Sequence, residues 1–291
     1  MKTYLECIPC FVRQATEAVQ LATSCEDKQL RFIRKLLEEI SRFDLSLSPP
    51  YIGQKVHRLI KEITGNPDPY QKIKEMTNRA ALSLLPRLRQ RIKESDDPFE
   101  MAVRYSIAGN IIDSATKSSV GTEDIERDIL GATSLLLDKE EVAHLKEEIT
   151  RAKSILFLGD NAGEIVFDRL LVEKIPREKI TYAVRGAPSI NDATLEDARA
   201  SGITELATVI DNGSDAPGTI LDDCSRDFQR SFWKSDVIIS KGQGNYESLS
   251  NVRHNIFFLF KVKCTVVEKE VGLPVGSLVV KGQKYKTKGE R

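Results

Sequence analysis

Residues 154–164 read SILFLGDNAGE: an apolar run of strand-forming residues leads into a turn that carries Asp160, Asn161 and Gly163. Glycine lets the chain turn into the helical pattern that follows, so this stretch is typical of one β–α unit. Similar apolar runs recur to the end of the chain, and helical stretches separate the earlier ones. This alternation predicts an α/β fold, a Rossmann-like three-layer domain with a mainly parallel sheet. Strands are expected at 154–158, 180–184, 207–210, 237–240, 255–260, 265–268 and 277–280, and helices at 165–174, 194–201 and 218–232.

The last three expected strands have no long helix between them, so the sheet should end in an antiparallel part. From about residue 6 to 150 the apolar spacing is helical instead. We therefore expect an all-helical domain over 1–115, a helical connection over 116–150, and an α/β domain that binds metal and phosphate over 151–291.

Two features of the helical half predict local structure. Apolar residues at intervals of three and four predict a buried stripe on one amphipathic helix. Pro86 is expected to kink or end a long helical segment at 70–93. The residues of the expected stripe are Leu30, Ile33, Leu37 and Ile40.

The chain of 291 residues can bury a large core, and its 43 Lys and Arg balance 43 Asp and Glu. This balance argues against a dedicated nucleic-acid binder, which usually carries a basic excess, so we interpret the basic stretch 281–288 as a solvated tail. The N-terminus lacks the apolar core of a signal peptide, and no run approaches the ~18 apolar residues of a membrane span. Five cysteines, an odd number, favour a reducing compartment. We expect a cytoplasmic protein without a nucleic-acid or membrane partner; its oligomeric state is not predicted.

Polar residues follow several of the expected strands at the point where each strand ends. An open α/β sheet binds its ligands outside the carboxyl ends of its strands. Asp160 and Asn161 can present a carboxylate and an amide oxygen to one hard cation such as Mg²⁺ or Mn²⁺, although either residue can instead cap the next helix. Asp192 can supply a third oxygen; capping is again the alternative, but a capping box of Thr194 and Asp197 would release it.

A second set of strand-end residues suits phosphate. Lys241 opens the sequence Gly242-Gln243-Gly244-Asn245, whose glycines permit a nest of backbone N–H groups around an anion. Arg185 can clamp a phosphate bidentately, and a surface salt bridge is an equally common fate for such an arginine. The run 211–213 is either a simple turn or part of a substrate pocket.

Cys7 and Cys10 form a C-x-x-C pair. A structural zinc site commonly needs two such pairs, and Cys25, Cys224 and Cys264 form no second one. Packing is therefore favoured over metal binding, with redox chemistry third. The three histidines show no ligand spacing, which argues against a histidine-based metal centre.

Taken together, these residues resemble the damage-control phosphatases, a family also called acidic-residue-methyltransferase-like. The resemblance implies a divalent metal (Mn²⁺, Ni²⁺, Mg²⁺ or Co²⁺) held by Asp160, Asn161 and Asp192, and substrate phosphate contacts from residues 241–245. Glu164 and Lys263 match substrate-pocket positions, although only the lysine of an Arg-Thr-x-Lys motif survives in Phe260-Lys261-Val262-Lys263. Asn110 and Asp113 match a family signature, and the C-x-x-C pair is similar to a subfamily proposed to act on damaged purine nucleotides. The matching elements are 7–10, 108–113, 159–164, 184–194, 209–219 and 239–247.

The resulting hypothesis is metal-assisted hydrolysis of small phosphomonoesters, side products or damaged metabolites such as purine nucleotides or sugar phosphates. Asp160, Asp192 and Lys241 would carry the catalysis, with Glu164, Arg185, Lys263 and residues 242–245 around the substrate. Two alternatives stay open: a carboxyl methyltransferase that uses S-adenosylmethionine, and a non-catalytic nucleotide-binding module.

Overall fold

The computed structural model describes residues 1–109, 127, 129–131 and 133–283. Asn110 and Asp113, which match a family signature, lie outside these residues, as do most of the basic positions in 281–288. Within the described part of the chain, no helix is long and apolar enough to cross a membrane.

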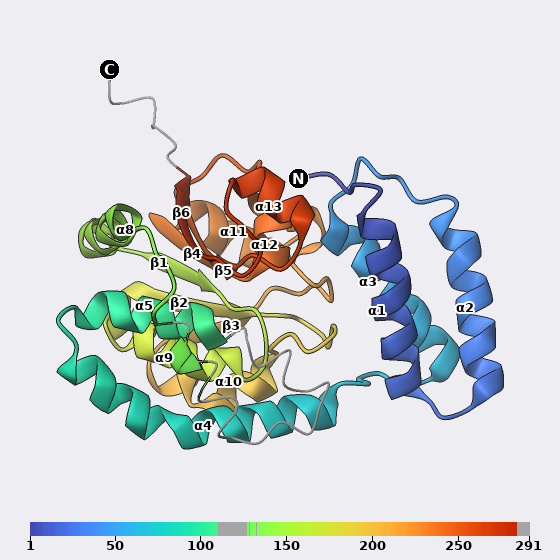
Figure 1. Ribbon diagram of the computed structural model, residues 1–291, viewed down its shortest axis with the longest axis horizontal. Helices are drawn as coiled ribbons and strands as arrows, with labels where there is room; N and C mark the ends of the chain where they lie inside the picture. The colour runs from blue at the N-terminus through green and yellow to red at the C-terminus, as the bar shows by residue number, and fades with distance from the viewer. Residues whose placement is uncertain (110–126, 128, 132, 284–291) are drawn as a thin grey trace.

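A six-stranded sheet forms the centre of the larger part of the molecule (Figure 1). The strand order is β3-β2-β1-β4-β5-β6, and β6 alone runs antiparallel to its neighbour. The predicted mainly parallel sheet with an antiparallel end is confirmed. The strands are β1 (Ile155–Leu158), β2 (Ile180–Val184), β3 (Thr208–Asp211), β4 (Val237–Lys241), β5 (Ile256–Lys261) and β6 (Leu278–Gln283).

Both faces of this sheet are covered by helices, which is why β1 is apolar at every position. Ile155 and Phe157 face one apolar core, while Leu156 and Leu158 face another. The first core is completed by α4 (Gln71–Glu94), α5 (Pro98–Ala108), α8 (Lys139–Arg151), α9 (Glu164–Val172) and α10 (Leu195–Ser201). The second is completed by α11 (Arg226–Lys234), α12 (Gln243–Leu249) and α13 (Thr265–Val271).

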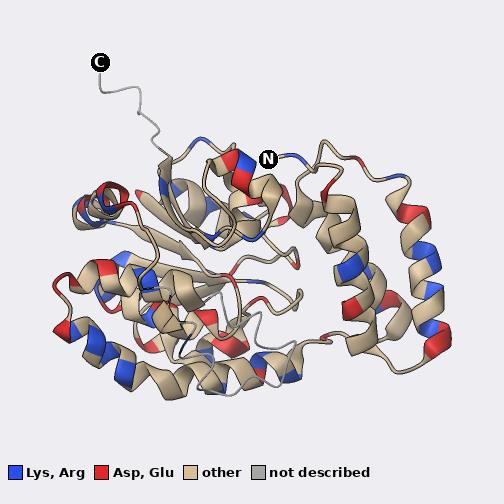
Figure 2. Ribbon diagram, in the orientation of Figure 1, with Lys and Arg blue, Asp and Glu red and all other residues tan. Residues whose placement is uncertain are grey.

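The first three helices form a separate small bundle with its own apolar core. They are α1 (Cys7–Ala22), α2 (Glu26–Ile40) and α3 (Pro49–Thr64). Figure 1 shows them together at one end of the molecule. Asp and Glu lie at both ends of α2 and Lys and Arg lie between them (Figure 2), in keeping with the balanced composition. The domain boundary near 115–150 stays a prediction, and the apolar cores group α4 and α5 with the sheet.

Two local predictions are wrong, and at Pro86, which was expected to kink or end a helix, the ending is excluded. Residues 265–268 belong to a helix, α13, because burial of Val267 against the second core outweighs the strand propensity of a short β-branched run. The predicted helix 218–232 is a 3-10 turn, Leu221–Asp223, followed by α11, which Ser225 caps. The helix at 70–93 does not end at Pro86: α4 continues to Glu94, because Leu84, Leu85 and Leu88 pack in the first core on either side of the proline.

The expected stripe of α2 is also wrong. Leu30 and Leu37 are 56% and 54% exposed, whereas Phe32 and Leu36 are buried. Ile33 and Ile40 do pack against the small core. The buried face is centred on Phe32, which the intervals of three and four residues did not include.

Candidate active site

The loops after β1 and β2 lie together at the carboxyl edge of the sheet. The backbone N–H of Ala193 donates to the carbonyl oxygen of Asp160 (2.8 Å), and the N–H of Ala162 donates to that of Asn191 (2.9 Å). An isolated antiparallel bridge joins Asn161 to Asp192. Residues that lie some thirty positions apart in the sequence are thereby held side by side. β1 also pairs with β4 where the strand order reverses, which is the position at which open α/β sheets bind ligands.

The helix cap after β2 is supplied by other residues, as predicted. The Asp197 carboxylate accepts hydrogen bonds from the backbone N–H and the hydroxyl of Thr194, both at 2.9 Å, and completes a capping box. Asp192 is therefore not the cap of α10. The loop before it is strained: Ile190, a β-branched residue, has a φ of 47°. Such a conformation costs about 1–3 kcal/mol and is often found at functional sites.

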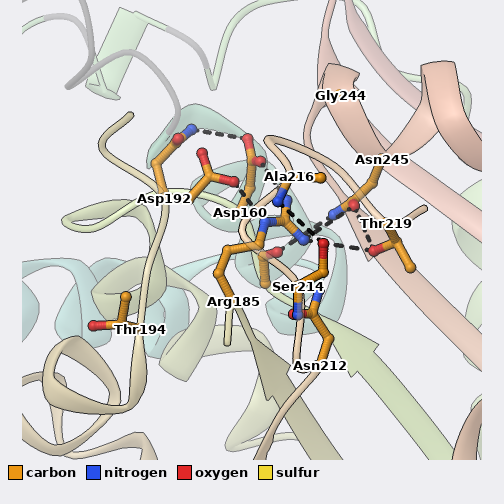
Figure 3. A network of polar contacts seen from close by, with 12 residues as sticks. Asp160, Arg185, Asp192, Thr194, Asn212, Ser214, Ala216, Thr219, Gly244 and Asn245 are labelled. Carbon is orange, nitrogen blue, oxygen red and sulfur yellow. Dashed lines mark hydrogen bonds and ion pairs between the residues drawn. The ribbon is translucent and has the colours of Figure 1, made fainter. Parts of the chain in front are cut away.

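Arg185 connects the two loop carboxylates (Figure 3). Its Nε lies 2.5 Å from Asp192 Oδ2, and its Nη2 lies 3.6 Å from Asp160 Oδ1. Burial alone would lower the pKa of this guanidinium, but the carboxylates of Asp192 and Asp160 outweigh burial and raise it. Nη2 is buried without a hydrogen-bond partner among the described residues. The predicted salt bridge of Arg185 is therefore buried and does not lie at the surface. Its Nη2 group is a donor that lies beside Asp160 without a hydrogen bond to any residue that the structure describes.

Asn161 lies between two acidic side chains. Its amide nitrogen donates to Asp160 Oδ2 (2.8 Å) and to Glu164 Oε2 (3.2 Å). Burial raises the pKa of Asp160 well above its usual value, and the charges of Glu164 and Asp192 raise it further. The exposed Lys263 acts in the opposite direction on the Asp160 pKa, which places its charge within electrostatic range of the site.

Lys241 is fully buried and points beneath the site. Its ammonium donates to Glu164 Oε1 (2.7 Å), to the carbonyl oxygen of Ser106 (2.8 Å) and to the Asp168 carboxylate. Tyr182 donates to the other oxygen of Asp168 (2.7 Å). The ammonium is thus directed to protein acceptors, and its predicted contact with a phosphate stays a prediction. The sequence analysis did not identify Asp168, Tyr182 or Ser106. The signal that could have indicated Asp168 is a single carboxylate inside the apolar helical run 165–172.

Buried charged side chains form one connected cluster among the described residues. Lys241 and Arg185 pair there with four buried carboxylates. The carboxylates belong to Asp160, Glu164, Asp168 and Asp192. Carboxylate oxygens of this kind suit a hard divalent cation.

The oxygen donors of Asp160, Asn161 and Asp192 fit a divalent metal ion. In this structure each of the three side chains also has a protein contact. Over the described residues, no three His, Cys, Asp or Glu side chains converge as ion ligands. The candidate set has only two carboxylates, and its third member is an amide. Arg185 now holds Asp192, and Asn161 turns its NH₂ group toward the carboxylates. The amide oxygen of Asn161 must replace that NH₂ group to serve as a ligand.

The loop after β4 is pressed against Asp160. Gly242 has a φ of 81°, and a Cβ atom on it would overlap the Asp160 carboxylate. Its N–H donates to the carbonyl oxygen of Leu259 (3.0 Å). A Cβ on Gly244 would similarly overlap the carbonyl oxygen of Pro217. These glycines therefore allow close backbone packing, in the first case directly against a proposed ligand.

Replacing Gly242 by alanine should displace the Asp160 carboxylate and lower phosphatase kcat/KM by about 10²-fold, the scale expected when a supporting group of a metal site is disturbed. Gly242 has a ψ of 156°, in a region that is essentially restricted to glycine, so alanine also adds backbone strain of about 1–3 kcal/mol, whereas Gly272, with a ψ of 20°, is in the left-handed helical region. Gly272, with a φ of 76° and open space around its missing Cβ, is the matched control. Steady-state kinetics and thermal melts of both variants are the measurements. Equal losses of activity in the two would show that strain, and not contact with Asp160, is responsible.

Asn245 and Gln243, two predicted substrate ligands, already have protein partners. The buried Asn245 amide donates to the carbonyl oxygens of Lys241 (2.8 Å) and Gly159 (3.3 Å), and accepts from the Thr219 hydroxyl (2.8 Å). It braces the ends of β1 and β4. The Gln243 amide donates to Glu247 Oε1 (2.8 Å) and accepts from the Lys263 N–H (2.9 Å). Their side chains organise the loop, and their backbone groups are left for the predicted phosphate contact.

Helices outside the sheet hold the site loops. On α4, the side-chain oxygen Oδ1 of Asn78 accepts from the N–H of Gly163 (2.7 Å), and its side-chain Nδ2 donates to Asp197 Oδ1 (2.8 Å). On α3, Arg58 pairs with Asp215 (2.7 Å), and Lys61 donates to the carbonyl oxygen of Pro188 (2.5 Å). The small bundle is therefore anchored to the loops after β2 and β3. None of these contacts was predicted, because each joins residues far apart in the sequence.

The chain is similar to known proteins over almost its whole length. The damage-control phosphatase ARMT1-like domain matches residues 3–279. A damage-control phosphatase of Pyrococcus horikoshii is 35% identical over 98% of this chain and 100% of its own, and one of Archaeoglobus fulgidus is 35% identical over 91% of each chain. An uncharacterized protein of Methanocaldococcus jannaschii is 39% identical over 94% of this chain and 93% of its own.

The fold has a counterpart among solved structures. The crystal structure of a DUF89 family protein from Pyrococcus horikoshii superposes with a TM-score of 0.87 at 34% identity. The match covers 98% of this chain and 100% of that chain. The shared architecture therefore includes the helical bundle as well as the sheet.

Proposed function

Because this chain belongs to the damage-control phosphatase ARMT1-like family, we propose that it is a metal-dependent phosphatase that hydrolyses small phosphomonoesters at the carboxyl edge of β1, β2 and β4. The observation that carries the proposal is the buried cluster of Asp160, Asn161, Asp192 and Arg185 at the point where the strand order reverses. Its carboxylate and amide oxygens suit a divalent cation, and the guanidinium of Arg185 suits an anionic substrate.

Asp160, Asn161 and Asp192 would hold the cation, for which Mn²⁺, Ni²⁺, Mg²⁺ and Co²⁺ are the candidates. A bound divalent ion supplies Lewis-acid stabilisation of phosphoryl oxygens and lowers the pKa of coordinated water. Arg185 would direct its Nη2 donor at a phosphoryl oxygen, a charge-assisted bond that strengthens as negative charge develops. Asp160 or Asp192 would accept the proton of the attacking water.

The remaining predicted residues would act around this centre. Lys241 neutralises Glu164 and Asp168, which limits the negative field that an anionic substrate meets. The backbone of residues 242–245 would contact the phosphate. Lys263 is exposed, so it would contact the substrate from the rim of the site. Damaged purine nucleotides and sugar phosphates are the proposed substrates, and the cytoplasm is the proposed compartment.

Phosphate release from a panel of esters tests the function. Sugar phosphates, phosphopantetheine and purine nucleotides are incubated with the protein and each of the four metals. We expect turnover with at least one metal and none after chelation with EDTA. Saturable nucleotide binding without phosphate release would favour the binding module. Calorimetric binding of S-adenosylmethionine without phosphate release would favour the methyltransferase.

Metal binding should also be visible without turnover. At a hundred times its Kd, an ion that binds only the folded chain stabilises it by about 2.7 kcal/mol. For a protein of this size we therefore expect Tm to rise by roughly 5–10 °C. Differential scanning calorimetry with and without Mn²⁺ measures this shift, and NaCl at matched ionic strength serves as a control for general ionic effects. An unchanged Tm at millimolar Mn²⁺ would contradict the proposed site.

A further inference from the structure

Three of the five cysteines lie close together at the start of α1, outside the proposed metal and phosphate site. Cys7 is the first residue of α1 and Cys10 the fourth. Cys264 immediately precedes α13. Cys7 interacts electrostatically with both other cysteines and with Glu247. The C-x-x-C motif, which the proposed function does not use, therefore has a third sulfur and a carboxylate as neighbours.

Packing does not account for the pair. The buried residues of α1 are Phe11, Ala15, Ala18 and Val19. Cys7 and Cys10 are only partly buried, and neither belongs to the apolar core of the small bundle. The packing role favoured by the sequence is thus not what the structure shows. Within the described part of the chain, these thiols and Glu247 also do not form a group that can hold a metal ion.

We propose that Cys7 and Cys10 are a redox-active dithiol that closes to a reversible disulfide. Residues three apart on a helix are neighbours, and C-x-x-C at a helix N-terminus is the spacing of known thiol–disulfide couples. Pro9 lies between them in the first turn, where it is compatible with the helix and restricts the backbone. Both thiols are partly exposed, so a small oxidant can reach them.

The oxidant is a small disulfide such as oxidised glutathione. The Cys10 sulfur loses its proton and attacks one glutathione sulfur; the S–S bond of the oxidant breaks, and the released glutathione takes up a proton. The Cys7 sulfur then attacks the Cys10 sulfur and displaces the second glutathione, with loss of the Cys7 proton. The two protein sulfurs give up two electrons in all, and two glutathione thiols form.

The order of the two attacks follows from the surroundings of each sulfur. Arg13 Nη2 lies 3.9 Å from Cys10 Sγ, so negative charge that develops on this sulfur meets a guanidinium. Burial raises the pKa of the Cys7 thiol, which disfavours Cys7 as the first nucleophile.

The dithiol is connected to the proposed phosphate loop. The Gln243 amide donates to Cys264 Sγ (3.5 Å) and to Glu247 Oε1 (2.8 Å). Both acceptors interact electrostatically with Cys7. A change in the first turn of α1 therefore lies one side chain away from a residue that orders residues 241–245.

Peptide mapping of the oxidised protein tests the proposal. Fully reduced wild-type protein is incubated with oxidised glutathione, alkylated and digested with trypsin. We expect peptide 3–13 to lose the mass of two hydrogen atoms and to carry neither alkyl group nor glutathione. Dithiothreitol should restore both thiols, so that all five react again.

The lone, exposed Cys25 is the matched control, because exposure alone would make it the preferred target. Cys264→Ser should keep the disulfide in peptide 3–13, and Cys10→Ser should lose it. The proposal fails if both thiols of peptide 3–13 remain alkylated while Cys25 carries glutathione, or if Cys7 is found joined to Cys264. Phosphatase activity does not enter these readouts, so this proposal and the proposed function can fail separately.

Discussion

Replacing Asp160 by asparagine should lower phosphatase kcat/KM by about 10³-fold, among the largest effects expected for any single residue of the site. The change removes a proposed metal ligand and, with it, part of the charge that attracts the cation. Losses of about 10²–10³-fold are typical when one essential electrostatic group of an active site is removed. Steady-state phosphate release with saturating metal is the measurement.

The Asp160→Asn substitution should lower activity without lowering the stability of the fold. Burial and the charges of Glu164 and Asp192 raise the pKa of Asp160, so a neutral amide at this position relieves the cost of burying a charge there and the repulsion from both neighbours. We expect the Tm without metal to stay equal or to rise, and the Tm shift with Mn²⁺ to disappear.

Asp227→Asn is the matched control for Asp160→Asn. The Asp227 side chain is 85% exposed on α11 and pairs with Arg230, so activity and the metal-induced Tm shift should both be unchanged. An Asp160→Asn protein that releases phosphate at the wild-type rate would remove Asp160 from the site. A protein that is inactive but still gains stability from Mn²⁺ would keep Asp160 in catalysis and deny it the metal.

The sequence predicts the sheet well because β1, β2, β4 and β5 are almost entirely buried. Runs such as 155–158 are apolar at every position, and polar, glycine-bearing turns follow β1, β2, β3 and β4. The adjacency of Asp160 and Asp192 also follows from topology, since parallel strands bring their carboxyl ends to one edge. These features depend on local pattern and on general rules of connection, both of which a single sequence contains.

Such patterns do not predict the direction in which each side chain of the site points. Lys241 stands at the end of β4, where the sequence places it beside a glycine loop, yet its ammonium turns beneath the sheet edge to Glu164 and Asp168. The deciding partner, Asp168, lies on α9 and is 73 residues away. Periodicity assigns Asp168 to a helix without indicating that this helix meets β4. The exposed Leu30 and the buried Phe32 of α2 show the same limit, since packing partners and not spacing fix the buried face.

The structure therefore changes what is expected of Lys241. Replacing it by methionine, which has a similar length and no charge, should destabilise the protein by about 3–5 kcal/mol, because removal of one partner leaves buried charges without their counter-ion. Burial alone would lower the pKa of Lys241, but Asp168 and Glu164 outweigh burial and raise it, so the ammonium is charged at neutral pH. We expect Tm to fall by roughly 10 °C. Chemical denaturation and calorimetry measure the loss.

A second substitution separates charge pairing from direct phosphate binding. Lys241→Met combined with Asp168→Asn should recover part of the lost stability, because one of the two buried charges is removed together with its partner. Lys269→Met is the matched control: this lysine is 72% exposed and pairs with Glu6 at 3.4 Å, so its loss should change stability by less than about 0.5 kcal/mol. If Lys241→Met instead keeps the wild-type Tm and raises KM for every phosphate ester, the ammonium binds the substrate phosphate. This is the role that the glycine loop beside it predicts from the sequence.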